Sequence, residues 1–84
     1  MPFVYILRCS DNSLYTGYTV DLKRRIEEHR QGAASKYTRG RRPVTLAYWE
    51  ELPDKKSALK REIAIKRMTK AAKEALLTRD SAIT

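Results

Sequence analysis

The sequence predicts an α+β fold, a small three-stranded antiparallel sheet flanked by helices in the order ββαβαα. Runs of β-branched and aromatic residues alternate with segments of helical apolar spacing, and turn-forming or helix-capping residues separate them. At 84 residues the chain has room for a single hydrophobic core. We expect residues 1–79 to form one domain and residues 80–84 to be a frayed C-terminal tail.

The first two strands are expected to form a hairpin. Residues 3–9 and 14–18 are β-branched and aromatic, and the Ser-Asp-Asn-Ser run between them is typical of a turn. Tyr5 and Tyr15 belong to this hairpin, and a strand tyrosine usually packs half-buried with its hydroxyl in water. Gly17 is unusual, because a glycine weakens a strand unless backbone or ligand approaches it closely.

The first helix is expected over about residues 21–31. Thr19 or Asp21 can cap its start, and Gly32 can end it. The loop that follows, residues 32–43, contains no acidic residue and four cations: Lys36, Arg39, Arg41 and Arg42. Four cations beside Tyr37 predict a nucleic-acid-binding surface, and a solvated surface loop is the structural alternative.

One more strand and two helices complete the predicted fold. Residues 44–50 alternate as a strand, with Val44, Leu46 and Tyr48 on one face and Thr45, Ala47 and Trp49 on the other. Pro53 and Asp54 open a helix that runs to about Met68. Thr69 can cap a short last helix.

The charge of the chain predicts an anionic partner. Lys and Arg number 18 against 10 Asp and Glu, a formal net charge of +8, which favours nucleic acid. A membrane surface is disfavoured, because the cations do not line one face of an amphipathic helix. The apolar run at residues 3–7 is too short for a signal peptide or a membrane span, and the single Cys9 cannot form an internal disulfide. We expect a cytoplasmic protein, with a monomer favoured.

Glu62 is a candidate site residue because of its place on the second predicted helix. The apolar face of that helix is expected to consist of Ala58, Leu59, Ile63 and Ile65. Glu62 falls near the middle of this face, where an unpaired carboxylate would cost several kcal/mol. It therefore needs either the structural partner Lys66, one turn on, or a cation.

Arg25 and His29 lie one turn apart near the apolar stripe of the first helix. In the structural interpretation Arg25 pairs with Asp21, and His29 is hydrogen-bonded at the edge of the core. Together with Glu62, the same residues supply a cation for an oxyanion, a titrating donor and a metal ligand. These are the parts of a phosphate site.

The chain resembles the GIY-YIG domain family, and within it the small single-domain bacterial members (UPF0213-like), over nearly its whole length. Phe3-Val4-Tyr5 stands where the family has Gly-Ile-Tyr, and Tyr15-Thr16-Gly17 stands where it has Tyr-Ile-Gly. Arg25, His29 and Glu62 then match, in order, the helix Arg, the following His and the downstream helical Glu. The late Asn of several family nucleases has no counterpart, since the only Asn is Asn12 in the hairpin turn.

The resemblance implies hydrolysis of a phosphodiester bond in DNA rather than RNA, including branched or damaged DNA and a role in DNA repair. It implies one divalent ion, Mg²⁺ or Mn²⁺, held weakly by Glu62. Tyr15 would be the general base with Tyr5 assisting, Arg25 would neutralise the phosphate, and His29 would support proton transfer. Two alternatives stay open: a nucleic-acid-binding module with the same fold and little or no cleavage, and an interaction protein of the translation or repair machinery.

Overall fold

The computed structural model describes the backbone of residues 1–83 and the side chains of residues 1–78. Its elements are β1 (Phe3–Arg8), β2 (Leu14–Thr19), α1 (Leu22–Arg30), α2 (Lys36–Arg39), β3 (Thr45–Glu51), α3 (Lys55–Lys66) and α4 (Lys70–Ile83). The predicted α+β class and the ββαβαα order are confirmed, with the short α2 added where only a loop was expected. Of the tail predicted to fray, residues 80–83 continue the backbone of α4, and Thr84 lies outside the described residues.

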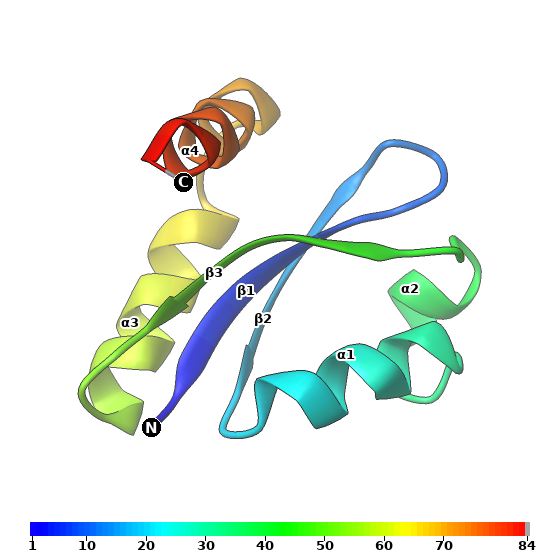
Figure 1. Cartoon of the computed structure of the whole chain (residues 1–84), viewed down its shortest axis with the longest axis horizontal. Helices are drawn as coiled ribbons and strands as arrows, with labels where there is room; N and C mark the ends of the chain where they lie inside the picture. The colour runs from blue at the N-terminus through cyan, green and yellow to red at the C-terminus, as the bar shows by residue number, and fades with distance from the viewer. Residues whose placement is uncertain (84) are drawn as a thin grey trace.

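The three strands form one antiparallel sheet in the order β2-β1-β3. The central strand β1 supplies four consecutive residues with no exposed surface, Val4 to Leu7. Because successive strand residues point to opposite faces, β1 feeds a hydrophobic cluster on each side of the sheet. Helices α1 and α2 lie on one face, and α3 and α4 lie on the other (Figure 1).

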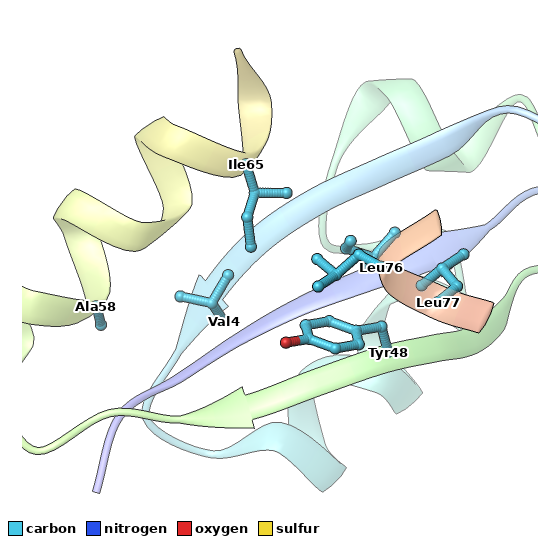
Figure 2. Packing of buried hydrophobic residues seen from close by; sticks show 7 residues of the cluster. Val4, Tyr48, Ala58, Ile65, Leu76 and Leu77 are labelled. Carbon is cyan, nitrogen blue, oxygen red and sulfur yellow. The ribbon is translucent and has the colours of Figure 1, made fainter. Parts of the chain in front are cut away.

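Each face of the sheet has its own core. On the face covered by α3 and α4, the cluster consists of Val4, Ile6, Tyr48, Ala58, Ile65, Leu76 and Leu77 (Figure 2). On the face covered by α1, it consists of Tyr5, Leu7, Cys9, Ile26 and Val44. Cys9, directly after β1, is a buried free thiol that packs in this second cluster.

Strand β3 changes face at a β-bulge. Ile6 of β1 lies opposite Tyr48, but the next residue, Leu7, lies opposite Leu46, which leaves Ala47 as an extra residue. The prediction that Val44, Leu46 and Tyr48 share one face is therefore wrong: Leu46 packs on the α1 side and Tyr48 on the α3 side. A bulge reverses the alternation of side chains, and simple alternation along the sequence does not reveal it.

The apolar face expected on α3 is only partly correct. Ala58 and Ile65, seven residues apart, are completely buried. Leu59 and Ile63 are 38% and 50% exposed. Only one stripe of the helix reaches the sheet, so the true buried face is narrower than the apolar residues suggest.

The expected capping residues are confirmed at three helix starts. The side chain of Asp21 accepts from the N–H of Arg24 at 3.1 Å, and that of Asp54 accepts from the N–H of Ser57 at 2.7 Å. At the start of α4, the Thr69 hydroxyl accepts from the N–H of Ala72 at 3.1 Å. Such caps satisfy backbone donors that have no partner within the helix. None of the helices in the described part of the chain is long and apolar enough to span a membrane.

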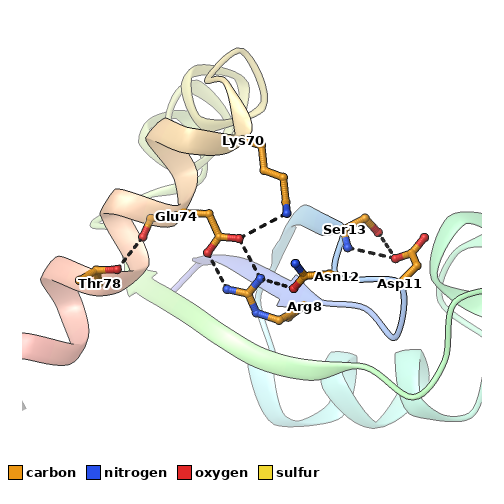
Figure 3. Close-up of polar contacts among 7 residues, drawn as sticks. All are labelled: Arg8, Asp11, Asn12, Ser13, Lys70, Glu74 and Thr78. Atoms are coloured by element: carbon orange, nitrogen blue, oxygen red, sulfur yellow. Dashed lines mark hydrogen bonds and ion pairs between the residues drawn. The ribbon is translucent and has the colours of Figure 1, made fainter.

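Helix α4 is joined to the sheet by a bidentate ion pair. Arg8, at the end of β1, donates to the two carboxylate oxygens of Glu74 at 2.6 and 2.8 Å, and to the side chain of Asn12 at 2.8 Å (Figure 3). Lys70 adds a further contact to Glu74 at 3.6 Å. The Arg8 hydrogen bond lowers the pKa of Glu74 to about 2. The paired arginine thus favours the ionised carboxylate in the folded state.

We expect Glu74→Gln to lower the melting temperature at pH 7 and to make stability less sensitive to acid. Because the pKa of Glu74 is lower in the folded chain than in the unfolded one, its stabilising effect is present above about pH 4.5 and is lost as the pH falls toward 2. Thermal unfolding measured from pH 7 down to pH 3 should show that the difference in melting temperature between wild type and variant becomes smaller as the pH falls. The exposed Glu51→Gln is the charge-matched control, and a gap that stays constant with pH would contradict the expectation.

Candidate active site

The structure brings Tyr15, Arg25 and His29 close to the hydroxyl of Tyr5, and the fifth expected side chain, Glu62 of α3, is near enough for its charge to act on Tyr5. We call this group, Tyr5, Tyr15, Arg25, His29 and Glu62, the Tyr5 cluster. The Tyr5 hydroxyl lies 2.8 Å from Nε2 of His29, and the Tyr15 ring packs 6.5 Å from the Tyr5 ring and 5.2 Å from the imidazole, centroid to centroid. The charges of Arg25 and Glu62 both act on the pKa of Tyr5. Residues from β1, β2 and α1 thus meet at one place, and α3 adds the nearby charge of Glu62.

Gly17 is the residue that lets the Tyr5 ring reach this place. It lies directly opposite Tyr5 in the β1–β2 pair. A Cβ atom built at Gly17 would be 2.4 Å from the Tyr5 hydroxyl oxygen and 2.5 Å from its ring carbon Cζ. The phenol therefore lies flat across the β2 backbone, in space that any other residue would occupy. This close approach explains a glycine within a strand.

His29 is held on both ring nitrogens, although it is completely buried. Nε2 is bonded to Tyr5, and Nδ1 lies 2.8 Å from the hydroxyl of Thr38 in α2. The Thr38 hydroxyl is itself 3.4 Å from the carbonyl oxygen of Ser35, to which it donates. A hydroxyl that donates to a carbonyl can accept from Nδ1–H, which leaves Nε2 free to accept from Tyr5.

Thr38 is a residue of the candidate site that sequence reasoning missed. It is completely buried and links His29 to the cap of α2. In the sequence it stands among the cations of an expected loop, so neither periodicity nor charge distinguishes it. Its role becomes visible only when α2 packs against α1.

Burial and nearby charges shift the pKa values of both partners in the Tyr5–His29 hydrogen bond. Burial raises the pKa of Tyr5, an effect that Tyr15 and Glu62 increase and Arg25 opposes. Burial also lowers the pKa of His29, and the Arg25 charge lowers it further. At neutral pH the resting pair is therefore a neutral phenol beside a neutral imidazole.

Arg25 pairs with an acid other than the expected one. Its Nε lies 3.0 Å from a carboxylate oxygen of Glu28, whereas Asp21 caps the helix backbone instead. The expected Arg25–Asp21 pair is therefore wrong, because the N-cap position leaves Asp21 turned to the N–H groups of the first turn. With its side chain 39% exposed, Arg25 can still meet an anion from solvent.

Glu62 forms the predicted structural pair without being sealed from solvent. One carboxylate oxygen lies 3.2 Å from Nζ of Lys66, whose side chain is 54% exposed, while the Glu62 side chain is 16% exposed. The described residues contain no group of three or more His, Cys, Asp or Glu side chains that could hold a metal ion. A single carboxylate still fits Mg²⁺ or Mn²⁺, since Mg²⁺ keeps several waters and often binds through one carboxylate plus substrate phosphate oxygens.

Hydrogen bonds and ring stacking hold the cationic loop in place. Arg41 donates to Asp11 at 3.1 Å and to the carbonyl of Tyr37 at 2.9 Å, and its guanidinium stacks 3.9 Å from the Tyr37 ring. The Tyr37 ring in turn lies 5.7 Å from that of Tyr15. Arg42 donates to backbone carbonyls, whereas Lys36 and Arg39 are exposed. The loop is thus connected to the Tyr5 cluster through stacked aromatic rings.

A groove of about 930 Å³ between α1 and β3 lies apart from this cluster. Its apolar lining includes Phe3, Leu22 and the exposed Trp49. Its charged residues balance, with the cations Lys23, Arg24 and Arg30 against the acids Asp21, Glu27 and Glu28. It contains none of the five cluster residues and has no excess positive charge for a polyanion.

Known proteins resemble the chain over nearly its full length. The family model described as the GIY-YIG catalytic domain matches residues 1–75. A UPF0213 protein of Halobacterium salinarum is 51% identical, covering 90% of this chain and 99% of the relative. One from Clostridium perfringens is 48% identical, with 96% and 87% covered.

Solved structures agree with the fold. The solution NMR structure of a UPF0213 protein from Bacillus halodurans is 44% identical, covers 93% of this chain and 84% of its own, and has a TM-score of 0.61. That of an E. faecalis protein is 36% identical, with 95% and 85% covered and a TM-score of 0.63. Matching motifs, order of elements and extended identity lead to one conclusion: this chain belongs to the GIY-YIG catalytic domain family and is one of its small UPF0213 members.

Proposed function

We propose that the protein is a metal-dependent endonuclease that hydrolyses phosphodiester bonds in DNA, branched or damaged DNA included. The observation that carries the proposal is the buried hydrogen bond between Tyr5 and His29, formed where Arg25 and Glu62 also act. A purely structural core would not need a tyrosine, a histidine, a guanidinium and a carboxylate at one point. A perturbed group beside a specific charged partner is typical of a catalytic site.

Glu62 is the residue that would hold the metal ion. Its second carboxylate oxygen has no hydrogen-bond partner among the described residues. A bound Mg²⁺ or Mn²⁺ would supply Lewis-acid stabilisation of charge on the phosphate oxygens. Lys66 competes for the same carboxylate and can swing into solvent, so the ion would be held weakly without substrate.

Tyr5 and His29 would supply a path for the proton of the attacking water once substrate binding opens the buried Tyr5 hydroxyl to that water. As the water oxygen forms its bond to phosphorus, its proton passes to the Tyr5 oxygen while the Tyr5 proton passes to Nε2 of His29. The P–O bond to the leaving oxygen breaks, and that oxygen takes a proton from solvent. This relay avoids a free phenolate, which the raised pKa of Tyr5 opposes.

Tyr15 remains a candidate for the general base, the role that the family resemblance implies. Its ring packs on His29, but no hydrogen bond to its hydroxyl is found among the described residues. Arg25 would neutralise the phosphate, since a half-exposed guanidinium is suited to an oxyanion. Separate Tyr5→Phe and Tyr15→Phe variants distinguish which phenol the water needs.

We expect Glu62→Gln to lower cleavage by about 100-fold or more while leaving the fold intact, because the amide keeps the shape but loses the charge that holds a cation. Purified protein would be incubated with plasmid, branched DNA and RNA in Mg²⁺ or Mn²⁺, beside the Tyr variants. Glu51→Gln makes the same charge change at an exposed position of β3 and should cleave normally. Cleavage that survives in Glu62→Gln and Tyr5→Phe alike would reject the proposal.

A nucleic-acid-binding module with little or no cleavage is the second candidate. The Lys66–Glu62 ion pair favours it, because a carboxylate that a lysine already neutralises is a poorer cation ligand. A wild type that binds DNA or RNA but cleaves neither would support this candidate. Lys66→Ala then tests the cause, since removal of the competing ammonium should raise cleavage if the pair is what suppresses it.

A further inference from the structure

One side of α3 carries cations that form no ion pair with any acid whose side chain the structure describes. Lys56, Lys60, Ile63 and Arg67 follow at intervals of four, three and four residues, so they lie along one stripe of the helix. All four are exposed, and Leu59 lies beside them, 38% exposed. We call these five residues the outer face of α3.

The cations of this face are free of ion pairs within the described part of the chain. Three neighbouring cations do have partners: Arg61 pairs with Glu50, Lys66 with Glu62 and Lys70 with Glu74. The acid at the start of α3, Asp54, caps the helix backbone, and the charge of Lys60 also lowers its pKa. With this single acid near three cations, the outer face has an excess of positive charge.

The outer face lies on the side of α3 that is turned away from the buried stripe of Ala58 and Ile65. Lys55, Leu59, Glu62 and Lys66 form the stripe between the two, roughly 100° around the helix axis from the outer face. On the opposite flank of Glu62, Arg61 reaches Glu50 of β3. The cationic loop that contains α2 lies on the other face of the sheet (Figure 1).

We propose that the outer face of α3 is a second nucleic-acid contact surface, which binds the phosphate backbone on the far side of the Tyr5 cluster from the α2 loop. Phosphates would contact Lys56, Lys60 and Arg67. Leu59 and Ile63 would pack against sugars or the edges of unpaired bases, which explains two apolar side chains left exposed among cations. The inference rests on the proposed function only in taking nucleic acid as the substrate.

The charge of the outer face favours nucleic acid over two other possible partners, a second copy of the chain and a lipid bilayer. A second copy placed face to face by a two-fold axis would bring three cations against three cations. A bilayer needs a broad apolar face for anchoring, and here two apolar side chains are flanked by charge. The phosphates of a nucleic acid would be attracted by the same cations that disfavour a second copy or a bilayer.

The test measures binding in the Glu62→Gln background, so that loss of cleavage does not affect it. Fluorescence anisotropy with labelled branched and duplex DNA would be recorded against salt concentration for Lys56→Gln/Lys60→Gln. Loss of two phosphate contacts should lower the slope of log K against log salt by about 1.8 and weaken binding several-fold relative to the control. The control Lys23→Gln/Lys73→Gln removes the same charge elsewhere and should change the slope less.

The apolar pair gives a second measurement. Leu59→Ser/Ile63→Ser should weaken DNA binding without changing the salt slope, and circular dichroism should show the fold retained, since both side chains are exposed. A salt slope and affinity equal to the control would overturn the inference. So would a concentration-dependent dimer, or anionic-vesicle binding, that the outer-face variants abolish while DNA binding is unchanged.

The inference and the proposed nuclease activity fail separately. If the wild type never cleaves but its DNA binding depends on Lys56 and Lys60, the contact surface stands and hydrolysis is rejected. If the protein cleaves and the outer-face variants bind and cleave like the control, the activity stands and the surface is rejected.

Discussion

Replacing Gly17 by alanine is expected to destabilise the fold by about 2 kcal/mol and to break the Tyr5–His29 hydrogen bond. The new methyl group would be 2.4 Å from the Tyr5 hydroxyl oxygen, far inside contact distance. The ring cannot move aside at low cost, because Tyr5 is completely buried and packs in the α1 core. For a domain of this size the melting temperature should fall by roughly 10 °C, and cleavage should be lost with it.

Gly40→Ala is the matched control for this change. A Cβ at Gly40 meets nothing within 4 Å, and the backbone there has a φ of −83°, which suits any residue. Its stability and activity should be those of the wild type, apart from a small entropic gain. If Gly17→Ala melts like Gly40→Ala and keeps the ring nitrogen shifts of His29, the close approach of Tyr5 to β2 is not what the site depends on.

The sequence predicts the secondary structure well because each signal is local. Asp21, Asp54 and Thr69 cap helices through their own side chains, and each starts its helix where expected. Gly17 is a local signal too, since its cost in a strand needs a compensating contact. The identity of that contact, the Tyr5 ring, follows from strand pairing.

What the sequence does not predict depends on contacts between distant segments. The bulge at Ala47 arises from pairing of β3 with β1, so alternation alone places Tyr48 on the wrong face. Leu59 and Ile63 were expected in a core, but the buried stripe of α3 is decided by the angle at which the helix meets the sheet. Thr38 carries no signal at all, because its function depends on α2 meeting His29.

The second large effect is expected from Thr38→Val, which should change the position of the His29 ring proton rather than the packing of the core. Valine has nearly the same shape, but it leaves Nδ1–H of the buried His29 without an acceptor, at a cost of about 1–3 kcal/mol. The imidazole proton should therefore move to Nε2, where it faces the Tyr5 hydroxyl. His29 could no longer accept from Tyr5, so kcat should fall on the order of 10²-fold with little change in KM.

The pH dependence of the wild type follows from the same network. Burial and Arg25 lower the pKa of His29 below its ordinary value of 6.5, so the ring stays neutral and kcat should not decline until the pH is below that value. The unfolded chain regains the ordinary pKa. It binds a proton that the folded chain excludes, and stability should therefore be lost as the pH falls below about 6.5.

The histidine tautomer gives a readout that a merely structural role for Thr38 would not change. The chain has a single histidine, so the ¹⁵N signals of its ring need no assignment. In the wild type the unprotonated nitrogen should be Nε2, and in Thr38→Val it should be Nδ1. Thr38→Ser restores the hydroxyl and should restore both the tautomer and kcat, with only the packing loss of one methyl group. An unchanged tautomer in Thr38→Val would show that Tyr5 alone sets the proton position, and the relay would then have to run without α2.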